Sequence, residues 1–309
     1  MVRAPEQDLA APATASLSPA ALLVELRPKQ WLKNGALLLP LLYSLRLTEP
    51  EALARAALAF LSFCCLSSAG YVFNDLRDLE ADRLHPVKQA RPLAARALPV
   101  SAGVGAMVLL GLLAALIGAQ LGRTFLATCA LYLAISVSYS LWWKHIVLID
   151  LFGISAGFVV RVVAGAVAVN VGVSPWLYAC AILGSLLIAL GKRRSEVLNL
   201  RNLATAHRPA LEGYTVEFLD QLMMMVSAAS IMAYSLYTFL GEFQPKNNLM
   251  MITIPVVLYG MFRYLYLTKV RGLGGSPEEL LLGDRALASA VAVFVLLSGA
   301  ILYWSLLRP

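Results

Sequence analysis

Long apolar stretches recur along the whole chain, and they constrain its fold more than any other feature of the sequence. Each is long enough to cross roughly 30 Å of hydrocarbon as a helix that rises about 1.5 Å per residue. Of the 309 residues, 60% are hydrophobic, which is well above the share in an ordinary soluble domain. We predict nine transmembrane helices, at residues 31–48, 53–73, 100–120, 123–142, 146–169, 175–191, 221–241, 249–267 and 285–306.

The gaps between these stretches leave no room for a separate soluble domain, because the longest of them, residues 74–99 and 192–220, hold only 26 and 29 residues. The predicted fold is therefore all-α, a polytopic membrane bundle over residues 26–309. Residues 1–25 are rich in Ala, Pro and Ser and lack the pattern of a signal peptide, so we expect a loose N-terminal tail.

Lys and Arg are distributed unequally between the two sides of the predicted bundle. If the N-terminus lies inside, 19 of the 25 basic residues lie on that side and 5 on the other, with Arg161 inside a span. Such an excess is typical of cytoplasmic loops. We expect an integral protein of the cell membrane whose N-terminus and charged loops are cytoplasmic. These loops account for the net charge of +7 and indicate membrane lipids as partners. We expect no nucleic-acid partner, and a homo-oligomer is compatible with the sequence.

The segment after the second stretch gathers acidic side chains. Asp75, Asp78 and Asp82 lie at i, i+3 and i+7 and would share one face of a helix. Asn74 adjoins the first of them, and Tyr71 lies one turn earlier. Oxygen-only clusters suit Mg²⁺, which completes its coordination shell with water and phosphate oxygens. We therefore predict Mg²⁺ as cofactor, with the three aspartates as catalytic residues and metal ligands and Asn74 as a further ligand. The alternative is a solvated helix end whose aspartates pair with basic neighbours, Arg77, Arg83 and Lys88.

Basic residues flank this segment on both sides. Lys88 and Arg91 follow it in a loop stiffened by prolines and are predicted to bind phosphate oxygens. Near the N-terminus, Lys29 and Lys33 lie at i and i+4, so a helix would place them on one face. We predict a binding site for the phosphate of a lipid, formed by Arg27, Lys29, Lys33 and Asn34. An interfacial anchor is the alternative for this group.

Several segments resemble a known superfamily. "NDLRDLEAD" followed by "HPVKQARPLAAR" resembles the first Asp-rich motif of the UbiA superfamily of intramembrane prenyltransferases. "LRPKQWLKN", "GKRRSE", "RYLYL" and "EELLLGDRAL" are similar to its branch that transfers phosphoribose to decaprenyl phosphate, and the resemblance extends from about residue 26 to 290. It implies a bundle of transmembrane helices with a membrane-embedded transferase site.

The sequence departs from the prenyltransferase pattern after the sixth stretch. There the superfamily's prenyltransferases carry a second Asp-rich motif, whereas "LGKRRSEVLNLRN" has no aspartate. This difference favours a donor with an additional phosphate, such as phosphoribosyl diphosphate. We predict that Lys192 and Arg193 bind its 5-phosphate and that Glu196 binds ribose hydroxyls or a second metal. Tyr139 and Lys144 are further candidates for the phosphate site.

The predicted reaction transfers 5-phosphoribose from phosphoribosyl diphosphate to a decaprenyl-like polyprenyl phosphate, with release of diphosphate, at the cytoplasmic membrane face. One alternative is transfer of a prenyl group from a prenyl diphosphate to an aromatic acceptor. Another is transport of an anionic lipid, which would require polar groups near the bilayer midplane. Only Arg161 lies clearly deep in a span, and its i+4 spacing from Gly157 and Gly165 favours a tight helix contact, so we expect it to be structural.

Overall fold

The computed structural model describes residues 18–202, 209–241 and 248–307, and in these ranges the chain forms helices and no strand. The fold is therefore all-α, as predicted. The elements, in chain order, are α1 (Pro19–Glu25), η1 (Pro28–Leu38), α2 (Leu39–Tyr43), α3 (Pro50–Arg77), α4 (Leu79–Leu84), η2 (Lys88–Ala90), α5 (Val100–Leu121), α6 (Arg123–Leu141), η3 (Trp143–His145), α7 (Ile149–Ala168), α8 (Pro175–Asn202), α9 (Pro209–Glu212), α10 (Val216–Leu240), η4 (Leu249–Thr253), α11 (Ile254–Lys269), α12 (Pro277–Gly283) and α13 (Arg285–Leu307).

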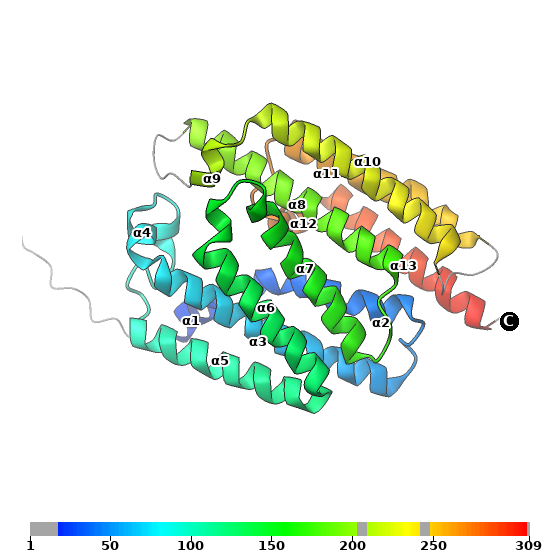
Figure 1. Ribbon diagram of the computed structural model, residues 1–309, viewed down its shortest axis with the longest axis horizontal. Coiled ribbons are helices and arrows are strands. Elements are labelled where there is room, and N and C mark those ends of the chain that lie inside the picture. Colours follow the sequence, from blue (N-terminus) through cyan, green and yellow to red (C-terminus); the bar gives the residue numbers. More distant parts are fainter. Residues whose placement is uncertain (1–17, 203–208, 242–247, 308–309) are drawn as a thin grey trace, which may run out of the picture.

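Eight segments in the described ranges are long and apolar enough to cross a membrane. They contain α3, α5, α6, α7, α8, α10, α11 and α13 and correspond to eight of the nine predicted spans. The chain is thus a polytopic membrane protein. Figure 1 shows the long helices side by side, with α1, α4 and α9 toward the left end of the bundle and the C-terminus at the right end.

The remaining predicted span, residues 31–48, does not form a long α-helix. It is divided between the 3₁₀ helix η1 and the short helix α2, in which Pro40 occupies the first turn. A 3₁₀ helix rises about 2.0 Å per residue instead of about 1.5 Å, so η1 and α2 together extend over about 30 Å. This length matches the hydrocarbon thickness. A ninth crossing by this segment stays a prediction.

Two helices form the centre of the bundle. In α3 and α7, 56% of the apolar window is buried, compared with 11% in α5 and in α11. α7 contacts α3, α6, α8, η1 and α2. The contact with η1 is tight because Gly165 lies directly against the backbone of Leu37. The two central helices are therefore held most firmly, and both carry charged residues of the site described below.

The end of the bundle that holds Asp75, Asp78 and Asp82 is called the aspartate end here. α1 belongs to it, although its residues fall in the expected loose tail. Ser18 caps the N-terminus of α1, and Leu22 and Leu26 pack against a buried cluster around Val72. Residues 1–17 of that tail lie outside the described residues. The folded bundle thus includes residues 18–25 as well.

Candidate active site

The helix that carries the aspartates ends inside the motif. α3 ends at Arg77, Asp78 is its C-cap with φ −90° and ψ 12°, and α4 begins at the next residue. The prediction that all three aspartates share one face of a continuous helix is therefore wrong. Asp75 and Asp82 share a partner, whereas Asp78 binds a different part of the chain.

Arg91 joins two of the aspartates. Its Nη1 atom donates to Oδ1 of Asp75 at 2.8 Å and to Oδ2 of Asp82 at 2.5 Å. Both carboxylates are only 2% exposed, whereas the Arg91 side chain is 26% exposed. Nζ of Lys88 lies 3.7 Å from Asp82. The loop that follows the motif therefore folds back over it, and phosphate binding by Lys88 and Arg91 stays a prediction.

Arg27 approaches the same carboxylates from the N-terminal side. It has a φ of 54°, a left-handed conformation that is uncommon for residues other than glycine. This conformation turns the chain between α1 and η1. The guanidinium forms an ion pair with Asp75 and lies 5.2 Å from the centre of the Tyr71 ring. Asp75 thus has two cationic partners from opposite sides of the motif.

Lys144 neutralises the third aspartate. It comes from η3, and its Nζ donates to both oxygens of Asp78, at 3.0 and 3.3 Å. Its side chain is only 8% exposed. The sequence alone offered Lys144 as a further candidate, and the structure places it in the aspartate cluster. Asn74 is half-buried one residue before Asp75.

Glu25 is a site residue that sequence reasoning missed. It is 1% exposed, and its Oε2 accepts from the backbone N–H of Leu93 at 3.4 Å. Its Oε1 is buried without a hydrogen-bond partner among the residues that the structure describes. Burial and the neighbouring Asp75 carboxylate raise the pKa of Glu25 to about 7. Its place two residues before Arg27 in "ELRPKQWLKN" was the available signal.

The donor atoms fit a hard divalent cation. Glu25, Asp75 and Asp82 supply only carboxylate oxygens, and one oxygen of Glu25 is buried without a hydrogen-bond partner in the described part of the chain. As they stand, no three acidic, histidine or cysteine side chains among the described residues converge on one metal position. Arg27 and Arg91 place positive charge between the carboxylates instead. A metal could therefore bind these carboxylates only if Arg27 and Arg91 moved away from them.

The charged residues of α8 bond to neighbours inside the bundle, and their binding of the donor 5-phosphate stays a prediction. Arg193 is 1% exposed, and its guanidinium forms ion pairs with Asp150 of α7 and with Glu196. It also donates to the hydroxyl of Tyr139 at 2.7 Å. Arg193 and Glu196 are thus partners of each other within α8, and the Arg193–Asp150 pair holds α8 against α7. Lys192 is half-buried beside them. Asp150, which the sequence analysis did not single out, explains why α8 can bury this arginine.

Loss of either partner of the Arg193–Asp150 pair is expected to destabilise the protein. Both side chains are 1% exposed, so Arg193→Met leaves a carboxylate buried without its cation, at a cost of about 3 kcal/mol. Asp150→Asn should have a comparable effect, and the double variant should cost less than the sum of the two. Thermal unfolding in detergent measures these losses. A normal unfolding temperature for Arg193→Met, with a raised KM for a phosphate substrate, would instead support the sequence-based role.

The N-terminal basic group is split by the geometry of η1. In a 3₁₀ helix residues i and i+3 are eclipsed, so Lys29 and Lys33 do not share a face as predicted. Lys29 is exposed, whereas Lys33 bonds to Gln30 and lies 3.2 Å from the carboxylate of Glu278 in α12. Glu278 is 5% exposed. The sequence analysis missed both Gln30 and Glu278.

Asn34 is fully buried between η1 and α3. Its amide nitrogen donates to Ser67 at 3.3 Å and contacts the sulfur of Cys64 at 3.4 Å. One turn nearer the aspartate end, the indole of Trp31 donates to Ser68 at 2.9 Å. Hydrogen bonds thus fix η1 to the part of α3 that precedes Tyr71, farther from the aspartate end.

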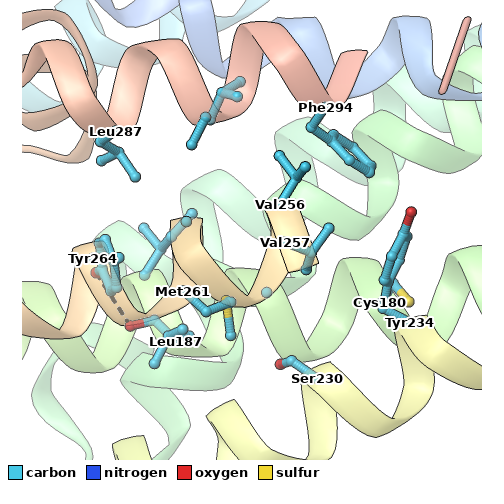
Figure 2. Close-up of a pocket in the computed structure, with 15 residues that line it drawn as sticks. Cys180, Leu187, Ser230, Tyr234, Val256, Val257, Met261, Tyr264, Leu287 and Phe294 are labelled. Carbon is cyan, nitrogen blue, oxygen red and sulfur yellow. Dashed lines mark hydrogen bonds between the residues drawn. The ribbon is translucent and has the colours of Figure 1, made fainter. Parts of the chain in front are cut away.

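An apolar cavity of about 350 Å³ lies among α8, α10, α11 and α13. Figure 2 shows Leu187, Met261 and Phe294 at its wall and the hydroxyl of Tyr264 near the carbonyl of Leu187, 3.4 Å away. Tyr264 also lies against Gly191, the residue before Lys192. One end of the cavity therefore adjoins the charged end of α8. Its size is in the range of small-molecule sites.

Sequence comparison identifies relatives over most of the chain. The model of the UbiA prenyltransferase family matches residues 37–207. A decaprenyl-phosphate phosphoribosyltransferase of Corynebacterium glutamicum is 37% identical, over 85% of this chain and 80% of the relative. A decaprenyl-phosphate phosphoribosyltransferase of Mycolicibacterium smegmatis is 30% identical, over 92% of this chain and 93% of the relative.

Structural comparison gives the same fold. A UbiA homolog from Archaeoglobus fulgidus, solved with GPP and Mg²⁺ bound, superimposes with a TM-score of 0.71. The match covers 92% of this chain and 99% of the homolog, at 19% sequence identity. At this identity the likeness concerns the helical architecture.

Proposed function

The chain belongs to the UbiA prenyltransferase family and is a membrane-embedded transferase, and from this premise we propose that it transfers 5-phosphoribose from phosphoribosyl diphosphate to a polyprenyl phosphate. Diphosphate is the leaving group. The similarity to decaprenyl-phosphate phosphoribosyltransferases over most of the chain supports this reaction. We further propose that the acceptor carries a long prenyl chain and that transfer takes place at the cytoplasmic face of the cell membrane.

The observation that carries the proposal is the charge pairing at the aspartate end. Each of the three aspartates has a cationic partner, from Arg27, Arg91, Lys88 or Lys144. With Mg²⁺ and a phosphorylated donor bound, the aspartates would hold the metal and the released cations would pair with phosphate oxygens. The charge of the site then stays balanced, which an isolated acidic or basic cluster would not achieve.

The chain's own residues would position the donor. Asp75, Asp78 and Asp82, with Asn74 and the buried Glu25 beside them, would hold Mg²⁺, which supplies compensation for the negative charge that grows on the leaving diphosphate. Lys88 and Arg91 would bind diphosphate oxygens, because their loop covers the motif. We assign the 5-phosphate to Lys144 and Lys192. Arg193 and Glu196 would orient Tyr139 beside it.

Transfer requires little acid–base chemistry from the protein. The acceptor phosphate is anionic at neutral pH, so no strong base is needed to activate it. Its oxygen forms the bond to C1 of the ribose while the bond from C1 to the diphosphate oxygen breaks, and the electron pair leaves with the diphosphate. Catalysis then depends on orientation and on fixed charges. Attack opposite the diphosphate gives inversion at C1.

The acceptor's prenyl chain needs an apolar path inside the bundle. We propose that part of it occupies the cavity among α8, α10, α11 and α13, because the lining is almost entirely apolar and one end adjoins Lys192. The chain then extends into lipid while its phosphate stays near the aspartate end. The water-soluble donor would reach the aspartate end from the aqueous phase on the cytoplasmic side.

Purified protein in detergent with Mg²⁺ tests the reaction. One reaction contains ribose-labelled phosphoribosyl diphosphate and a polyprenyl phosphate, and a second contains a labelled prenyl diphosphate and an aromatic acid. We expect label in the lipid phase from the ribose donor and no prenylated aromatic product. Prenylation in the second reaction, without ribose transfer in the first, would contradict the proposal and favour the prenyltransferase alternative.

Metal removal should stop transfer completely. Without a divalent cation, Arg27 and Arg91 stay paired with Asp75, and the donor diphosphate has neither metal nor free cations. We expect EDTA to lower ribose transfer below detection and excess Mg²⁺ to restore it. Ca²⁺ should restore little, since it prefers longer bonds and more ligands. Full activity after extensive chelation would show that the aspartates act without metal.

A further inference from the structure

Arg161 is a buried cation whose hydrogen-bond partners are all neutral. It lies in α7 and is 5% exposed. Nε donates to the amide oxygen of Asn34 at 2.7 Å, Nη1 to the carbonyl of Gly157 at 2.8 Å, and Nη2 to the hydroxyl of Tyr132 at 2.8 Å. The rings of Tyr132 and Phe158 lie 4.8 and 5.4 Å from its guanidinium carbon. These contacts stabilise the cation without cancelling its charge.

The ion pairs among the described residues do not include Arg161. A buried charge without a counter-ion is costly inside a membrane protein and usually serves a function. Arginine also has five N–H groups, and the three hydrogen bonds above use three of them. Two N–H groups therefore remain for an anion.

A second cation lies nearby. Lys33 directly precedes Asn34, which accepts a hydrogen bond from Arg161, and the carboxylate partner of Lys33 is Glu278, 3.2 Å away. Together these three groups carry one net positive charge. Tyr71 lies one turn before Asp75 on α3, and its ring is 5.2 Å from the guanidinium carbon of Arg27. The surroundings of Arg161 thus remain positive after every described ion pair is counted.

The direction of the Arg161 side chain determines where its guanidinium lies relative to the aspartates. Asn34 bonds to Ser67, which lies eight residues before Asp75 on α3, or about 12 Å along the helix. The guanidinium bonds to Gly157, one turn nearer the aspartate end, because helical side chains lean toward the helix N-terminus. It therefore lies on the membrane side of the aspartates and extends toward them. In the proposed reaction the nucleophile must approach C1 from this side, opposite the leaving diphosphate.

We propose that Arg161 and Lys33 bind the phosphate of the lipid acceptor. The two remaining N–H groups of Arg161 would contact two phosphate oxygens, and Lys33 would neutralise the remaining charge. This inference rests on the proposed function, since it names where the acceptor of that reaction is held. It adds Arg161 to the residues predicted to bind the acceptor phosphate. From the sequence, Arg161 was expected only to pack helices together.

Asn34→Asp separates binding from packing. The substitution keeps the size of the side chain and the bond from Nε of Arg161, so a purely structural role of Arg161 is preserved. The amide N–H bond to Ser67 is lost, but the Ser67 hydroxyl can donate to the new carboxylate instead. It also gives Arg161 a counter-ion, which cancels the charge available to a phosphate. We expect the KM for the polyprenyl phosphate to rise about 10- to 100-fold, the range for losing a hydrogen bond to a charged group. The KM for phosphoribosyl diphosphate should change less than about twofold.

Binding of farnesyl phosphate and of farnesol to the full-length protein, without donor, gives a second readout. Wild type should prefer the phosphate, and Asn34→Asp and Arg161→Lys should lose about tenfold of that preference while farnesol binding stays unchanged. If Arg161→Lys does not fold, Lys33→Met is the replacement, because Lys33 is partly exposed. An unchanged preference in folded variants would overturn the inference. Failure of the proposed function would appear differently, as absence of ribose transfer in wild type.

Discussion

Asp75→Asn is expected to lower ribose transfer by about three orders of magnitude. Asp75 is 2% exposed and is the aspartate on which Arg27 and Arg91 both converge. Asparagine keeps the shape but loses the negative charge that a metal requires. Initial rates at saturating donor and acceptor, measured across Mg²⁺ concentrations, would quantify the loss.

A matched control separates loss of chemistry from loss of folding. Asp220→Asn removes a carboxylate that pairs with Arg194 and Lys269, is 29% exposed and lies outside the aspartate cluster. We expect this variant to keep most of the wild-type activity. Both variants should be compared by thermal unfolding in detergent. A folded Asp75→Asn protein that retains a tenth or more of wild-type activity would show that this aspartate does not hold the metal.

Gly165→Ala is expected to cost about 4 kcal/mol or more and to leave little folded protein. A Cβ atom at this position would overlap the carbonyl oxygen of Leu37 and would lie 2.8 Å from its carbonyl carbon. These are backbone atoms, so a change of side-chain rotamer cannot relieve the overlap. Helices η1 and α7 would have to separate, which would also break the bond from Arg161 to Asn34.

Gly111→Ala in α5 is the matched control for this prediction. It places the same methyl group on a helix, at a position with no atom within 4 Å of the new Cβ. Because alanine favours a helix over glycine by up to about 1 kcal/mol, stability should stay the same or rise slightly. Equal yields of folded Gly165→Ala and Gly111→Ala protein after purification would contradict the close contact between η1 and α7.

Composition and periodicity were sufficient to predict most of the fold. A membrane helix must satisfy its backbone hydrogen bonds internally, so long apolar stretches have few alternatives to a helix. Eight of the nine predicted spans are present for this reason. The segment at 31–48 differs because it is short, contains Pro40 and packs against the backbone of α7, and these contacts determine its geometry more than its hydropathy does.

The ion-pair partners of charged residues were harder to predict than the transmembrane helices. The sequence showed that Asp75, Asp82 and Arg91 lie close together, since they belong to one segment. It did not indicate that Glu25 would be buried against Asp75 or that Asp150 would neutralise Arg193, because these partners are distant in the chain. The surroundings of Arg161 could not be predicted for a related reason. Its helix position was clear, but the direction of its side chain and its bond to Asn34 depend on packing.

The order of amino acids was enough to predict a helical membrane transferase of the UbiA family with an acidic motif at one end of its bundle. Hydropathy and a local motif carry that information because both act over short distances along the chain. The packing of the helices determines which cations neutralise which aspartates, which arginine holds helices together and which one keeps an uncompensated charge. Those outcomes follow from Coulomb interactions and burial between residues far apart in sequence, so they exist only once the helices have packed.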